Sequence, residues 1–192
     1  QRLPFEILGE IFSLMVRPMF LPAETENAPW LFTRVCRRWS AVALATPALW
    51  SRVTLELDPD VTEGSLSLTN LCFQRSGQVP LTVTVIQEDG VCNSHPLLDV
   101  VFSSSERWRI AVLYINLPPI QQITSIHGSL SALTTLLISV QLRTDQGFDE
   151  EFLNVFSIAP QLRSLQALLW KDGGGPDGFE GRGSGWRHRP YC

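Results

Sequence analysis

Residues that could bind a metal ion or act as a nucleophile are few and scattered in this chain. The three histidines, His95, His127 and His188, lie 32 and 61 residues apart and form no short-range pair of ligands. Ser129 stands close to His127, but it lacks the flanking glycines of a nucleophile elbow. We therefore assign no catalytic residue and no metal ligand from the sequence.

A run of glycines late in the chain matches the spacing of a nucleotide-binding loop. Residues 173–178 satisfy Gly-x-Gly-x-x-Gly and follow an apolar segment that ends at Trp170. A phosphate-binding loop must lead into a helix, whereas Pro176 and further glycines up to Gly185 follow here. The match therefore reflects composition, so no cofactor is assigned, and residues 171–192 are predicted to be a flexible tail.

Composition sets the class of protein and excludes several partners. Of the 192 residues, 44% are hydrophobic and 18% are charged, which is typical of a globular protein. The formal net charge of −4 gives no attraction for a phosphate backbone, so nucleic acid is not expected as a partner. No apolar run reaches the roughly 18 residues of a membrane span. The four cysteines form neither a Cys-x-x-Cys pair nor a compact disulfide framework, which favours reduced thiols in the cytoplasm or nucleus.

The first fifty residues are predicted to fold as short helices. Apolar residues recur at helical spacing from Pro4 to Met15, and Pro18 ends that helix. After a loop, a second helix is expected to begin near Pro29 and to carry one apolar face over residues 31–43, and a last short turn covers residues 46–50. Such a small bundle cannot bury all of its apolar and aromatic side chains, so the surplus needs a partner surface.

Three separated blocks of this segment carry a specific pattern. They read Leu3-Pro4-Phe5-Glu6-Ile7-Leu8 with Glu10-Ile11-Phe12, then Val35-Cys36-Arg37-Arg38-Trp39, and finally Thr46-Pro47-Ala48-Leu49-Trp50. In this order the blocks resemble the F-box family in its fungal F-box-like form, although the loop between the first two is longer than in the shortest F-boxes. The resemblance implies a three-helix module over residues 1–51 that binds a Skp-type adaptor. The positions it implies as adaptor-binding are Leu3, Pro4, Ile7, Leu8, Phe12, Val35, Cys36 and Trp39.

The same resemblance implies a non-catalytic role as the substrate-recognition subunit of an SCF-type ubiquitin ligase, joined through the adaptor to a cullin. Within the module, we expect Leu3, Pro4, Leu8 and Phe12 to favour adaptor contact. Core packing is favoured for Ile11, Trp39 and Trp50, because buried aromatics usually hold a module together. Two alternatives stay open: a leucine-rich scaffold whose helical end packs inward without a ligase role, and a small α/β enzyme, for which no convergent set of ionisable residues can be named.

The remainder of the chain alternates predicted strands with helical segments. Strands are expected at residues 53–57, 81–85, 110–115, 133–138 and 162–168, and helices at 63–75, 96–104, 119–126 and 149–159. Taking residues 53, 83, 111, 136 and 165 as equivalent gives separations of 30, 28, 25 and 29 residues. This period is near the upper end of the leucine-rich-repeat range.

The local pattern also resembles a degenerate leucine-rich repeat. Leu133-x-x-Leu136-x-Ile138 is the best match, and equivalent segments begin at Trp108 and Leu162. We therefore predict an α+β fold, in which the helical module precedes a short solenoid with parallel strands over residues 52–170, and a compact doubly wound sheet is the alternative. An unknown protein substrate would bind the concave strand face. The outward candidates there are ordinary solvated strand positions, namely Thr54, Glu56, Thr82 and Thr84.

Overall fold

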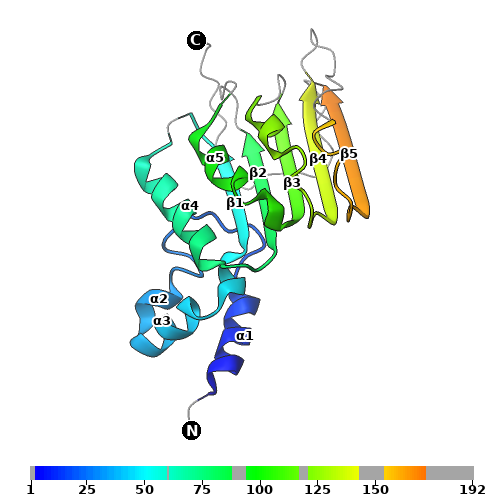
Figure 1. Ribbon diagram of the computed structural model, residues 1–192. Helices are drawn as coiled ribbons and strands as arrows, with labels where there is room; N and C mark the ends of the chain where they lie inside the picture. The colour runs from blue at the N-terminus through cyan, green and yellow to red at the C-terminus, as the bar shows by residue number, and fades with distance from the viewer. Residues whose placement is uncertain (1–2, 60, 88–93, 117–120, 143–153, 172–192) are drawn as a thin grey trace.

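The chain folds into a small helical module followed by a parallel sheet (Figure 1). A computed structural model describes residues 3–59, 61–87, 94–116, 121–142 and 154–171. The predicted α+β class is confirmed at this level. The predicted Gly-rich tail beyond residue 171 lies outside the described residues, as do residues 149–153 of the helix predicted at 149–159. Residues 155–159 are described and are not helical, so that part of the prediction is wrong.

The N-terminal module contains three α-helices and one short 3-10 helix. These are α1 (Phe5–Met15), α2 (Phe32–Val35), α3 (Arg37–Leu44) and η1 (Pro47–Trp50). The predicted first helix is confirmed, with Pro4 at its N-cap. The predicted continuous second helix is wrong, because Cys36 is extended at φ −162° and ψ 165° and divides it. The Cys36 Sγ accepts the Trp39 N–H at 3.5 Å, which gives the restarted helix a capping partner.

Five strands then form one sheet in strictly sequential order, β1-β2-β3-β4-β5, and every neighbouring pair is parallel. They are β1 (Arg52–Leu57), β2 (Leu81–Gln87), β3 (Trp108–Asn116), β4 (Thr135–Leu142) and β5 (Ser164–Lys171). The connections contain α4 (Glu63–Arg75), α5 (Pro96–Phe102), η2 (Ser105–Arg107) and η3 (Gln121–Ile126). A doubly wound sheet reverses its strand order at a switch point, and the described strands have no such reversal.

The two faces of the sheet differ in burial. The inner face is covered by the connections, since α4 contacts α5 and α5 contacts η3 along the sheet (Figure 1). Side chains alternate between the faces, as expected for strands. Those that fill the inner face are Val53, Leu55, Leu57, Leu81, Val83, Val85, Ala111, Leu113, Ile115, Leu136, Ile138 and Val140. The core of the strand region therefore lies between the sheet and its connections.

The sheet ends differently at its two edges. At β1, the Thr54 N–H donates to the Phe20 carbonyl at 2.8 Å, so the loop before α2 closes this edge. At β5, the inward position Leu165 is 57% exposed, whereas its register partner Leu136 is fully buried. Within the described residues, no further strand covers the free edge of β5 in the way that β5 covers β4.

An arginine joins the module to the strand region. Its guanidinium, on Arg75 at the end of α4, lies 4.8 Å from the ring centroid of Trp30 and 4.5 Å from that of Trp50. The two indoles meet edge to face at 4.9 Å. Each indole N–H is also bonded, Trp30 to the Pro22 carbonyl and Trp50 to the Ala43 carbonyl. These hydrogen bonds hold both indole rings in the orientation on which the guanidinium packs.

Replacing Arg75 with alanine should lower the melting temperature by several degrees. Two cation–aromatic contacts of about 1 kcal/mol each would be lost, and a domain of this size loses about 2–4 °C per kcal/mol. Arg75→Lys keeps the charge without the planar group and should recover only part of the loss. Differential scanning fluorimetry measures this, with the exposed Arg52→Ala as the control. An unchanged melting temperature for Arg75→Ala would contradict the assigned role.

Candidate functional site

Helix α1 carries two apolar stripes that lie side by side. One stripe, formed by Leu8, Gly9 and Phe12, is buried. The other, formed by Ile7, Ile11, Leu14 and Met15, is exposed, and it spans about 100° of the helix surface at about 100° per residue. Leu3, just before the helix, is also exposed. We call these five exposed residues the apolar surface of α1.

The buried stripe of α1 is held by an aromatic cluster. The rings of Phe12 and Phe32 stack with centroids 4.1 Å apart and planes 13° from parallel. Trp39 lies 4.9 Å from Phe12 and 6.1 Å from Phe32 in tilted and edge-on arrangements. Gly9 allows a close approach here, since an added Cβ would lie 3.3 Å from the Thr46 Oγ1. The cluster joins α1, α2 and α3 and orients the apolar surface of α1 away from them.

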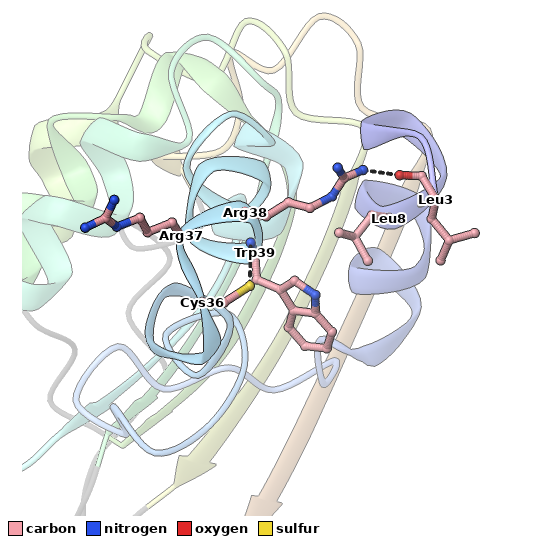
Figure 2. Close-up of a pocket in the computed structure, with 6 residues that line it drawn as sticks. All are labelled: Leu3, Leu8, Cys36, Arg37, Arg38 and Trp39. Carbon is pink, nitrogen blue, oxygen red and sulfur yellow. Dashed lines mark hydrogen bonds between the residues drawn. The ribbon is translucent and has the colours of Figure 1, made fainter. Parts of the chain in front are cut away.

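An open hollow connects the start of α1 with the start of α3 (Figure 2). Leu3 and Leu8 line it from the first segment, and Cys36, Arg37, Arg38 and Trp39 line it from the second. Arg38 donates a hydrogen bond to the Leu3 carbonyl, and its guanidinium lies 4.8 Å from the centroid of the Phe5 ring. Arg38 therefore positions the residues that precede α1. Figure 2 shows Arg37 directed away from the other labelled side chains.

The sequence-predicted adaptor positions fall into three groups by burial. Leu3, Pro4, Ile7, Val35 and Cys36 are exposed, and Trp39 is half-buried. Leu8 and Phe12 are instead buried, at 6% and 0% exposure. Leu8 and Phe12 therefore pack inside the module, beneath the exposed apolar residues, and they present little surface area to a second protein.

Three expectations about the core can be compared with the structure directly, and of these Trp39 is half-buried and packs against the core. Trp50 is fully buried, as predicted. Ile11 was expected to be core, and this is wrong, because it is 38% exposed on the outer stripe of α1. The sequence pattern defined the apolar positions of the helix but not which of them face inward. It also did not single out Leu14, Met15 and Leu31 as exposed, although all three are.

The described residues contain no group of three or more His, Cys, Asp or Glu side chains that could hold a metal ion. His95 has a structural role, because its Nδ1 accepts the Leu97 N–H at 3.2 Å and caps α5. Its Nε2 lies 2.9 Å from the Asp58 carbonyl, which leaves no ring nitrogen free for chemistry. No described helix combines the length and apolar character needed to cross a membrane.

Comparisons with protein-family models, with curated proteins and with solved structures returned no match for this chain.

Truncating one side chain in each stripe of α1 should change the unfolding free energy, measured by urea denaturation, by very different amounts. Phe12→Ala removes a fully buried ring and should cost about 3–5 kcal/mol of unfolding free energy. Ile7→Ala removes a half-exposed side chain and should change it by about 0.5 kcal/mol or less. Equal destabilisation by the two variants would mean that the exposed stripe is packed in solution.

Alkylation should distinguish the two described cysteines. Burial raises the pKa of the Cys72 thiol to about 12, although the nearby Arg75 acts in the opposite direction, so Cys72 should stay protonated and shielded at pH 8. Cys36 is exposed and should react rapidly with iodoacetamide. Peptide mapping by mass spectrometry follows each site separately, and Cys72 should react only after urea is added. Rapid labelling of Cys72 in the folded protein would contradict the burial described.

Proposed function

We propose that this chain is the substrate-recognition subunit of an SCF-type ubiquitin ligase, which binds a Skp-type adaptor through its N-terminal module. The observation that carries the proposal is the apolar surface of α1, which remains exposed although the buried residues of the module and of the sheet form one hydrophobic core. Complete burial of a fully exposed aliphatic side chain is worth about 1.5–3 kcal/mol, and the side chains of this surface, which are 38–87% exposed, forgo part of that free energy. Several such side chains on one helix are typical of an interface.

The positions of the F-box-like blocks support the same partner. Leu3, Pro4 and Ile7 come from the first block, and Val35 and Cys36 from the second, and all five are exposed. Leu3 and Cys36 line the same hollow, shown in Figure 2, although 33 positions separate them in the sequence. A docking surface built from two separated blocks is what the resemblance implies. The role of Leu8 and Phe12 is then to hold the surface in place.

The strand region supports a leucine-rich-repeat-like solenoid as the second part of the receptor. The positions that repeat in sequence also stack in register, since Ala111 pairs with Leu136 and Leu136 with Leu165. The next inward column continues in the same way from Leu113 to Ile138. Each strand therefore adds one layer to its neighbour, which is the construction of a solenoid. In this proposal the region binds the substrate, and ubiquitin transfer is carried out by partner proteins.

Charged substitutions on the exposed surface should abolish adaptor binding without unfolding the protein. We expect the double variant Ile7→Asp with Val35→Asp to bind a purified Skp-type adaptor at least ten-fold more weakly in calorimetry. The matched control is Leu168→Asp, which alters an equally exposed leucine on β5, at 52% compared with 48% for Ile7 and 51% for Val35. A melting temperature near that of the wild type would show that the double variant is folded.

Two further results decide the proposal. Bound adaptor should protect Cys36 from iodoacetamide, because that thiol lines the hollow at the centre of the predicted contact. Undiminished binding by the folded double variant, or no adaptor binding by the wild type, would refute the docking assignment. The latter result would favour a leucine-rich scaffold without a ligase role.

A further inference from the structure

The edge of the sheet at β5 lacks the features that usually protect a strand edge. Among the described strands β5 pairs only with β4, so the N–H and C=O of every second residue face outward. Natural proteins blunt such edges with charged side chains, with proline or with a covering segment. Residues 164–170 contain no charged residue and no proline. The backbone of β5 is therefore a template for a further strand.

The side chains of β5 are also uncovered. On the inner side, Leu165 is 57% exposed although its register partner Leu136 is fully buried. Ala167, two residues later on the same side, is exposed beside the buried Ile138. On the outer side, Leu168 is 52% exposed. Pairing with a further strand would remove part of this apolar surface from water.

The sequence of β5 is complementary to itself. A two-fold axis perpendicular to the sheet would pair the β5 strands of two copies antiparallel, with opposite residues projecting to the same side. When the axis passes between the two Gln166 residues, Leu165 of each copy lies opposite Ala167 of the other, so a large side chain faces a small one. The two Leu165 side chains then lie diagonally across the axis, within reach of each other. The Gln166 amides face each other and can exchange hydrogen bonds.

Charge and overlap distinguish this register from its neighbours. Centring the pair on Ala167 would place Arg163 directly opposite Lys171 of the other copy, and like charges in opposite positions repel. Centring it on Leu165 would pair only residues 164–166 of the two strands. Centring it on Gln166 pairs residues 164–168 and places no two like charges opposite each other.

We propose that β5 is a self-association edge, at which a second copy of this chain pairs antiparallel about a two-fold axis at Gln166 and joins two five-stranded sheets into one. The helical module lies at the β1 edge (Figure 1), so the apolar surface of α1 stays free in both copies. The inference is therefore independent of the proposed function. Strands of this length give a small interface, and we expect a dissociation constant of about 10–100 µM.

Sedimentation equilibrium of the full chain tests the association. Between about 1 and 300 µM, the average mass should rise from 21.5 kDa towards twice that value. Leu165→Lys places like charges near the axis and should raise the dissociation constant at least about ten-fold. The matched control is Ile7→Lys, which alters a similarly exposed side chain on α1, at 48%, and should associate as the wild type does. A melting temperature near that of the wild type shows that each variant is folded.

Disulfide crosslinking tests the register. In a chain with Cys36, Cys92 and Cys192 replaced by serine, Gln166→Cys should give a covalent dimer under mild oxidation. Opposite residues have Cα atoms about 4.5–5.5 Å apart, which a disulfide can bridge. Leu165→Cys should link much more slowly, because the diagonal separation is about 7–8 Å. Non-reducing gel electrophoresis measures both rates.

Three outcomes would overturn the inference. The first is a mass of one chain throughout the concentration range. The second is undiminished association of a folded Leu165→Lys variant. The third is crosslinking through residue 165 as fast as through residue 166, because the two-fold pairing at Gln166 requires the opposite order.

Discussion

The geometry of α1 is the constraint on which the arrangement of the module depends. The helix is apolar on two adjacent stripes, and the aromatic cluster of Phe12, Phe32 and Trp39 can cover only one of them. Its packing partners are short, with four residues in α2 and eight in α3. Rotating α1 to bury Ile7 and Ile11 would expose Phe12, which costs more apolar area than it gains. The outer stripe therefore stays at the surface in the folded chain.

The same module also serves as the end piece of the sheet. Its loop occupies the edge of β1 through the bond between Thr54 and Phe20, and Arg75 holds the indoles of Trp30 and Trp50 against α4. A parallel sheet with an open first edge would leave backbone donors and acceptors unpaired. Closing that edge with the loop before α2 fixes the orientation of the module relative to the strands. The exposed stripe of α1 therefore has a defined position relative to the sheet.

Local pattern was sufficient to predict the strands and several helices. The alternation of residues 53–57 and 81–85 marked β1 and β2, and the helix at 63–75 was predicted with the bounds that α4 has. The break at Cys36 was missed because an apolar period of 3.6 continues across one extended residue. The Arg75 cluster was missed for a different reason: Trp30 and Arg75 are 45 positions apart, and only the folded chain brings them together. For Ile11, periodicity predicted only that the residue lies on an apolar stripe of the helix. Which side of the helix faces inward depends instead on the aromatic ring that packs against it.

Core side chains fill the inner face of β1 to β4 and the buried stripe of α1, whereas the outer stripe of α1 and the outer face of the sheet carry apolar side chains that are not fully buried. These surfaces differ in chemistry. The α1 stripe is formed by aliphatic side chains on a convex helix, which suits a partner that supplies a groove. The outer sheet face instead carries half-buried apolar neighbours on adjacent strands, such as Val112 and Leu137. Because the two surfaces share no residue, a substitution on one leaves the side chains of the other in place.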